Sequence, residues 1–219
     1  GVAFLYAQQI ARHGSNCAES RPRLMSTRVI GITGGVGMGK SITAKLLREQ
    51  GVPVVDSDDL ARKVVAVGEP ALAEIADTFG AEFLDAKRKL DRGKMAAHIF
   101  GNDAERKKLE AIIHPRVRER WIAQMETWRA DNMPLGVVVI PLLFEVGAEG
   151  EFDSVICVAC TGNTQRARLR SREWDDAQID ARIAAQMEVT EKIKRADQVV
   201  WTEGDISLLR EQLQRIFAG

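Results

Sequence analysis

The sequence predicts an α/β fold, in which helices cover both faces of a mainly parallel sheet of five strands. The first observation is a set of short apolar runs without polar alternation, such as residues 29–33 and 136–140. Strands that are buried on both faces have this pattern and are typical of parallel sheets. The second observation is that these runs alternate with segments whose apolar residues recur every three or four positions, as in amphipathic helices. The pattern therefore predicts three layers, α/β/α.

A glycine-rich loop directly follows the first apolar run. Residues 34–41 read Gly-Gly-Val-Gly-Met-Gly-Lys-Ser, the pattern of a phosphate-binding loop, or P-loop. Glycines let successive N–H groups point at phosphate oxygens, and the helix after the loop adds the positive end of its dipole. Lys40 would reach the β- and γ-phosphates of ATP, and Ser41 would bind Mg²⁺. The loop thus predicts the fold of the P-loop NTPases. We expect the ATP site to include Gly35, Val36, Gly37, Met38, Gly39, Lys40, Ser41 and Ile42.

The remaining elements follow from periodicity and from start and stop signals. A short strand is expected at residues 52–55, followed by a helix that opens at Asp56-Ser57-Asp58 and continues to Val67. The dipeptide His114-Pro115 is expected to break a helix. The other predicted helices are 42–50, 70–79, 91–100, 103–113, 115–131 and 206–217, and the other strands are 136–140, 154–159 and 198–201.

One domain is expected over residues 28–219, with two insertions in a P-loop core. Residues 1–27 are expected to be an N-terminal extension, either disordered or added by cloning, because the first strand begins directly after Met25-Ser26-Thr27. The core would comprise residues 28–62, 133–161 and 195–219, with a helical acceptor-binding insert at 63–132 and a lid at 162–194.

Composition narrows the class of partner. The 219 residues include 31 Lys and Arg and 31 Asp and Glu, so the formal net charge is zero, whereas a nucleic-acid-binding protein usually carries a basic excess. The chain has no apolar stretch of membrane-spanning length, and its three cysteines are too few and too scattered for a disulfide framework. We therefore expect a cytoplasmic protein that binds small molecules rather than nucleic acid or membranes, as a monomer or a weak homo-oligomer.

Several classes of P-loop protein do not fit the rest of the chain. A switch GTPase needs an Asn-Lys-x-Asp motif, which is absent, and Asp77-Thr78-Phe79-Gly80 lies in the helical region rather than after a strand. A remodelling ATPase would carry an apolar strand that ends in Asp-Glu, whereas residues 137–140 run into Pro141. A small-molecule kinase fits better.

Beyond the loop, further motifs make the chain resemble the dephospho-coenzyme A kinases from Arg28 to the C-terminus. These motifs are Val55-Asp56-Ser57-Asp58 followed by Ala61-Arg62, then Ile113-His114-Pro115, Pro141-Leu142-Leu143-Phe144-Glu145 and Ala196-Asp197. The resemblance implies transfer of the γ-phosphate of ATP to the ribose 3′-hydroxyl of dephospho-CoA, the last step of coenzyme A synthesis. Two positions depart from the family: Ile42 stands where Thr is common, and Thr202 where an Asn near the adenine is usual.

Asp56 and Asp58 are the candidates for the catalytic base. If the chain is still extended there, both carboxylates project to the same side at the end of the second strand. Alternatively, one of them only caps the helix that would begin near Leu60. The residues alone leave both possibilities open; the resemblance implies Asp58 as the base, with Asp56 as its partner through a hydrogen bond or an Mg²⁺-bound water.

Four arginines, at positions 166, 168, 170 and 172, fall in one predicted helix of the lid. A run of like charges is usually a solvated surface, but related kinases use lid arginines to neutralise the transferring phosphoryl group. The resemblance implies that Arg168 and Arg172 bind phosphate, with Arg168 catalytic together with Lys40 and Asp58. Lys192 also matches a family lysine and ranks below them.

The resemblance also implies an acceptor pocket formed by Asp56, Asp58, Arg62, His114, Arg118, Pro141, Leu142, Leu143 and Glu145. A lone histidine before a proline is more often structural than catalytic, and Glu145 could simply pair with a nearby arginine. Two other classes of function remain open: a different nucleoside or small-molecule kinase, and a non-catalytic module that binds ATP.

Overall fold

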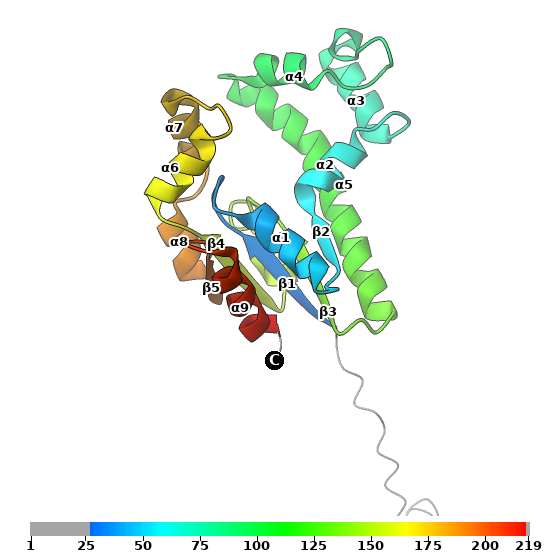
Figure 1. Cartoon of the computed structure of the whole chain (residues 1–219). Coiled ribbons are helices and arrows are strands. Elements are labelled where there is room, and N and C mark those ends of the chain that lie inside the picture. Colours follow the sequence, from blue (N-terminus) through cyan, green and yellow to red (C-terminus); the bar gives the residue numbers. More distant parts are fainter. Residues whose placement is uncertain (1–26, 218–219) are drawn as a thin grey trace, which may run out of the picture.

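A five-stranded sheet runs through the centre of the molecule, as the computed structural model of residues 27–217 shows (Figure 1). The strands are β1 (Arg28–Thr33), β2 (Val54–Asp56), β3 (Leu135–Val139), β4 (Ser154–Ala159) and β5 (Gln198–Trp201). Their order in the sheet is β2-β3-β1-β4-β5, and every neighbouring pair is parallel. The prediction of a parallel five-stranded sheet is confirmed. The predicted extension at residues 1–27 lies outside the described residues except for Thr27, whose buried hydroxyl donates to the carbonyl of Trp128 over 3.2 Å.

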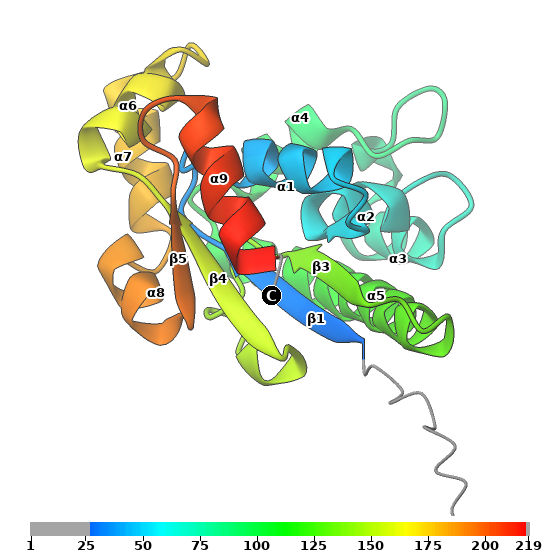
Figure 2. The same ribbon diagram turned by 60° about the horizontal axis from the view of Figure 1, so that its bottom comes forward.

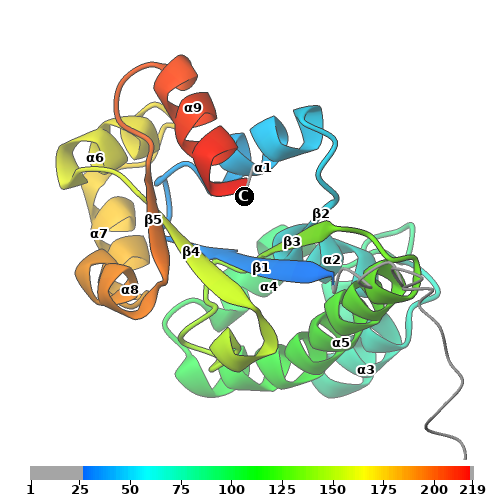
Figure 3. The same ribbon diagram turned by 90° about the horizontal axis from the view of Figure 1, so that it is seen from below.

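Helices cover both faces of the sheet, so the three-layer prediction is confirmed. Ile30 and Ile32 of β1 point to one face, where they pack against α1 (Lys40–Glu49) and α9 (Ile206–Phe217). Val29 points to the opposite face, where it belongs to the same apolar cluster as residues of α5 (Asp103–Ala130). Figures 2 and 3 show α1 and α9 side by side on one face and α5 on the other. Side chains alternate between the two faces along each strand, and apolar residues at successive positions of the central strands therefore bury both faces.

The segment between β2 and β3 is helical, as expected. It contains α2 (Ser57–Val64), α3 (Pro70–Phe79), the 3-10 turn η1 (Ala81–Phe83), α4 (Arg92–Ile99) and α5. The predicted break at His114-Pro115 is wrong, because α5 is one helix of 28 residues that runs through this dipeptide. Pro115 removes one helical N–H, a loss of about 3 kcal/mol relative to Ala. Buried Ile112 and Val117 hold the helix on both sides of the proline, and the guanidinium of Arg116 donates to the carbonyl of Ile112 over 2.6 Å.

Three helices occupy the predicted lid: α6 (Gly162–Arg170), α7 (Asp176–Ala184) and α8 (Val189–Arg195). A short 3-10 turn, η2 (Glu149–Glu151), lies between β3 and β4. In Figure 1, α6 and α7 stand on one side of the P-loop end of the sheet, and α3 and α4 on the other. Whether the insert and the lid behave as separate units stays a prediction. Within residues 27–217, no helix combines the length and the apolar character needed to cross a membrane.

Candidate active site

The P-loop links the end of β1 to the start of α1. Gly39 has a φ angle of 99°, in the left-handed region that glycine tolerates, and precedes the first helical residue, Lys40. A Cβ atom at Gly39 would lie 2.8 Å from Cγ2 of Thr202, so this position also needs glycine for close packing. No side chain caps the start of α1, which leaves the N–H groups of its first turn for another acceptor. This is the geometry of an anion site at a helix N-terminus.

Lys40 folds back over the loop. Its Nζ atom donates to the carbonyls of Gly34 and Gly35 over 2.7 and 2.9 Å. Burial, followed by the positive charge of Lys192, lowers the pKa of Lys40 to about 8, and the carboxylates of Asp58 and Asp56 oppose this shift. The ammonium group therefore lies at the phosphate loop with both candidate carboxylates close enough to affect it.

Asp56 caps the helix, so the capping alternative holds for this residue and the chain is no longer extended at Asp58. Asp56 ends β2 with φ and ψ of −113° and 123°, and its Oδ1 atom accepts from the backbone N–H of Asp58 over 2.9 Å. Helix α2 begins at Ser57 rather than near Leu60, because an aspartate at this position supplies the acceptor that the first turn needs. Asp58 therefore lies within the first turn of α2.

Asp58 keeps its carboxylate free of that capping bond. Desolvation, followed by the negative charge of Asp56, raises the pKa of Asp58, while Lys40 and Arg62 oppose the shift. A carboxylate whose pKa is raised in a cleft binds a proton more strongly than an ordinary aspartate does. The arrangement can accept a proton from a hydroxyl group placed beside the P-loop.

A cavity of about 830 Å³ adjoins Asp58. Its walls come from α2, from the middle of α5 and from the segment after β3. Of the predicted acceptor-site residues, the cavity brings together Asp58, His114, Arg118, Pro141 and Leu142. Helix α5 presents His114 and Arg118 four residues apart on one face, which is possible only because the helix continues through Pro115.

Other predicted acceptor-site residues lie behind the cavity wall or beside it. Leu143 has no exposed surface and packs in the core. Arg62 pairs with Asp59 on α2 over 2.6 Å, and its charge opposes the rise in the pKa of Asp58, but its side chain does not line the cavity. Glu145 pairs with Lys192 of α8 rather than with an arginine. Asp56, occupied as the cap, is also absent from the cavity walls described in the structure.

The cavity also contains residues that the sequence analysis missed. Glu151 of η2 pairs with Arg118, and the guanidinium of Arg118 lies 5.9 Å from the ring centroid of Trp121. Lys107 and Glu110 add charged groups from α5. Lys107 and Glu110 fall in the predicted helix 103–113, but helical spacing alone does not show that they face a cavity, and Glu151 carried no sequence signal.

The lid touches the P-loop through two glutamines. The side-chain amide of Gln165 on α6 donates to the carbonyl of Val36 over 2.8 Å, and the N–H of Val36 donates to Oε1 of Gln186 over 2.8 Å. Leu169 of α6 packs against Gly37, where a Cβ atom would lie 2.9 Å from Cγ of the leucine. The sequence carried no signal for these contacts, because they join residues more than 120 positions apart.

Arg168 behaves differently from the other lid arginines. Arg166 and Arg170 form ion pairs with Asp180 and Asp176 of α7 at the surface. Arg168 instead donates to the hydroxyl and the carbonyl of Thr202, next to the P-loop. The prediction that Arg172 shares its helix is wrong, because α6 ends at Arg170 and the hydroxyl of Ser171 donates to the carbonyl of Arg168 over 2.8 Å.

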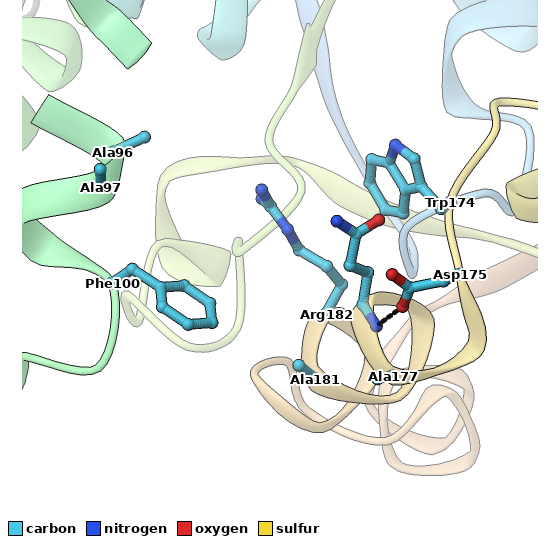
Figure 4. A pocket seen from close by; sticks show the side chains of 9 residues that line it. Ala96, Ala97, Phe100, Trp174, Asp175, Ala177, Ala181 and Arg182 are labelled. Carbon is cyan, nitrogen blue, oxygen red and sulfur yellow. Dashed lines mark hydrogen bonds between the residues drawn. The ribbon is translucent and has the colours of Figure 1, made fainter. Parts of the chain in front are cut away.

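A second cavity, of about 460 Å³, lies between α4 and α7 (Figure 4). Phe100, Ala96 and Ala97 form one wall, and Trp174 and Arg182 stand opposite, with the guanidinium 5.3 Å from the indole centroid. Because its walls belong to the insert and to the lid, its volume depends on how closely those two segments approach each other.

The site offers a few oxygen donors near the P-loop that could contact a metal ion. Between residues 27 and 217 there is no group of three or more His, Cys, Asp or Glu side chains that could enclose one. Ser41 lies exposed in the first turn of α1, and the charges of Asp56 and Asp58 reach the neighbouring Lys40. These are oxygen donors of the kind that Mg²⁺ prefers, and Mg²⁺ is commonly held by a few protein oxygens together with substrate phosphates. The donors therefore fit a magnesium-nucleotide complex.

Comparison with known proteins gives a consistent result. The family model described as dephospho-CoA kinase matches residues 28–207. A dephospho-CoA kinase of Anaeromyxobacter dehalogenans is 46% identical over 192 residues, which cover 87% of this chain and 91% of the relative. The corresponding Bacillus cereus protein is 41% identical over 191 residues, covering 87% and 96%.

Solved structures agree with the fold. A crystal structure from Thermus thermophilus matches with a TM-score of 0.75 and 35% identity over 88% of this chain and 97% of its own. The dephospho-CoA kinase of Campylobacter jejuni, at 22% identity over 88% and 97% of the two chains, matches in fold with a TM-score of 0.61.

Proposed function

Because the chain belongs to the dephospho-CoA kinase family, we propose that it transfers the γ-phosphate of ATP to the ribose 3′-hydroxyl of dephospho-CoA. The products are coenzyme A and ADP, and the reaction ends coenzyme A biosynthesis. One observation supports this assignment at the site: Asp58 lines the 830 Å³ cavity and its carboxylate, whose pKa is raised, lies close enough to Lys40 of the P-loop to affect that lysine. A module that merely binds ATP has no need of such a carboxylate.

The P-loop binds the triphosphate in this proposal. The uncapped N–H groups at the start of α1 donate to phosphate oxygens, and Lys40 leaves the carbonyls of Gly34 and Gly35 to neutralise the β- and γ-phosphates. The whole predicted loop, from Gly35 through Ser41 to Ile42, forms this site.

Ser41 supplies a hydroxyl ligand to Mg²⁺ that arrives with ATP. The bound ion would neutralise charge on the β- and γ-phosphates. Nothing else in the mechanism requires a metal-binding cluster from the protein.

Asp58 is the base. The 3′-hydroxyl oxygen attacks the γ-phosphorus, the bond from that phosphorus to the β,γ-bridging oxygen breaks, and the hydroxyl proton passes to the Asp58 carboxylate while ADP leaves. Asp56 supports this step by capping α2, which fixes the start of the helix that carries Asp58. Phosphoryl transfer depends mainly on alignment and charge neutralisation, and a fixed carboxylate provides the alignment of the nucleophile.

Arg168 neutralises charge on the transferring phosphoryl group from the lid side. Its guanidinium has five N–H donors, of which two are used on Thr202, so others are free for phosphate oxygens. Arg172 remains a weaker proposal for phosphate binding, because it lies beyond the end of α6.

The acceptor binds in the 830 Å³ cavity, where His114, Arg118, Pro141 and Leu142 contact it. Arg62, Leu143 and Glu145 support the site from behind through charge, packing and the ion pair to α8. We also retain the division into core, insert and lid, a monomer or weak homo-oligomer, and a cytoplasmic location as proposals.

A coupled assay of ADP release tests the assignment. Purified protein with Mg-ATP is given dephospho-CoA, a panel of nucleosides, or no acceptor, and the product is identified by mass. We expect ADP release that depends on dephospho-CoA and a product that carries its new phosphate at the ribose 3′ position. Release with nucleosides alone would indicate another kinase, and binding of ATP without turnover on any acceptor would indicate a non-catalytic module.

A further inference from the structure

Thr202 connects three parts of the active site although it lies just beyond the last strand. Its side chain is buried, with 4% of the residue exposed, and its backbone N–H donates to the carbonyl of Ala159 over 2.9 Å. Its hydroxyl lies 2.9 Å from the carbonyl oxygen of Met38 in the P-loop and 2.8 Å from Nη1 of Arg168 in the lid. Its own carbonyl accepts a second bond from Arg168.

The chemistry of the hydroxyl fixes the direction of these bonds. Nη1 of Arg168 can only donate, so the hydroxyl accepts from it. The carbonyl of Met38 can only accept, so the single hydroxyl proton goes to it; the carbonyl of Ala159, at 3.4 Å, is the more distant alternative. The single hydroxyl proton is then used inside the protein, so the hydroxyl has no donor left for the base of a nucleotide.

The methyl group of Thr202 is also used. Cγ2 lies 2.8 Å from the position that a Cβ atom of Gly39 would occupy, so the methyl fills the space left by that glycine. The side chain of Thr202 thus packs against the loop, bonds to it and holds the lid arginine through its hydroxyl, while the backbone carbonyl of Thr202 holds the arginine at a second place.

We infer that Thr202 is a positioning residue for phosphoryl transfer, which holds the guanidinium of Arg168 at a fixed place beside the P-loop. The inference rests on the proposed role of Arg168 in the lid. Without the hydroxyl, Arg168 loses one of its two anchors and the carbonyl of Met38 loses its partner, so the guanidinium is less well aligned when charge develops on the phosphoryl group. Substrate binding, which depends on the loop amides and on the acceptor cavity, is largely unaffected.

Substitutions that separate the hydroxyl of Thr202 from its methyl group test this role. Thr202→Val keeps the volume and removes the hydroxyl, whereas Thr202→Ser keeps the hydroxyl and removes the methyl group. We expect Thr202→Val to lower kcat about 10-fold or more with KM for dephospho-CoA within about 2-fold of wild type, the pattern of a contact made in the transition state. Thr202→Ser should retain kcat within about 3-fold of wild type. If Thr202→Val does not fold, Thr202→Ala and Thr202→Ser still differ only in the hydroxyl and carry the same comparison.

A double-mutant cycle separates positioning from a local effect. If Thr202 acts through Arg168, adding Thr202→Val to Arg168→Ala causes little further loss of kcat, because the two substitutions remove the same interaction. Full additivity of the two losses of kcat would overturn the inference. An equal loss of kcat in Thr202→Ser and Thr202→Val would also overturn it. So would a normal kcat in Thr202→Val when Arg168→Ala is impaired. A normal kcat in Arg168→Ala would overturn both the inference and the lid role. Wild-type protein without acceptor-dependent turnover would overturn the proposed function itself.

Discussion

Lys192 and Glu145 form an ion pair in which the lysine is fully buried and the glutamate partly exposed, with Nζ of the lysine 2.8 Å from Oε1 of the glutamate. Among the charged residues of positions 27–217, only Lys192 is buried, and its side chain has no exposed surface. Nζ also donates to the carbonyl of Pro141 over 2.8 Å, and Glu145 accepts from the N–H of Met187 over 2.9 Å. The pair therefore joins α8, at the base of the lid, to the segment after β3 that forms a wall of the acceptor cavity.

Lys192→Met should destabilise the protein, because it leaves Glu145 without its cation. Breaking a buried pair costs about 3–5 kcal/mol. Because the side chain of Glu145 is 21% exposed, we expect a smaller loss than for a fully buried pair, about 2–3 kcal/mol. Urea denaturation measures the change. Lys194→Met is the control on the same helix, since Lys194 is exposed and should change the free energy of unfolding by less than about 0.5 kcal/mol. Equal stability of the two variants would contradict the importance of the pair.

Lys40→Ala should abolish most activity without unfolding the protein. Lys40 is the cation of the P-loop, and loss of one such stabilising group costs about 10²- to 10³-fold in kcat, or shows as weaker ATP binding. Steady-state kinetics and nucleotide titration measure the two effects. Lys45→Ala, an exposed residue of the same helix, should behave as wild type. Near-normal turnover of Lys40→Ala with Mg-ATP would contradict the kinase mechanism.

Asp58→Asn should depress kcat by about 10²- to 10⁴-fold, the usual effect of losing a general base. Both substrates should still bind, because the P-loop and the acceptor cavity keep their shape. Asp56→Asn is the informative comparison, since asparagine caps helices nearly as well as aspartate and should leave much of the activity. Binding titrations and single-turnover kinetics check both variants. An inactive Asp56→Asn beside an active Asp58→Asn would reverse the two roles.

The pH profile of kcat/KM should have two limbs. Activity should rise as Asp58 loses its proton, at a pH above the usual range for an aspartate because its pKa is raised. Activity should fall as pH rises through about 8, where Lys40 of the free enzyme loses its charge. Lys40→Arg removes a titrating group and should abolish the alkaline limb in whatever activity remains. An alkaline limb that persists unchanged in that variant would show that Lys40 does not cause it.

Arg168→Ala should lower kcat more than it raises KM for dephospho-CoA, because the contact strengthens only as charge develops on the phosphoryl group. Arg170→Ala, whose side chain pairs with Asp176 at the surface, is the matched control and should retain normal kinetics. Steady-state kinetics of the two purified variants decides the point. If both behave as wild type, the lid arginines are only a solvated surface.

Local sequence determined the sheet and the phosphate site. Apolar runs dictated strands that are buried on both faces, and β4 and β5 have the predicted bounds. The loop needed only its own glycines, Lys40 and Ser41 to be recognised, because its function resides in its own backbone.

Tertiary structure decided which side chains meet, and at Pro115 it overrode local preference. Packing on both sides of Pro115 kept α5 continuous, whereas the cap formed by Asp56 is a local contact with Asp58. The contacts of Thr202 with Arg168, and of Lys192 with Glu145, join residues 34 and 47 positions apart and depend on how the lid docks onto the sheet. Periodicity shows which face of a helix is buried, but the partner of a buried polar group is set only when distant segments pack together.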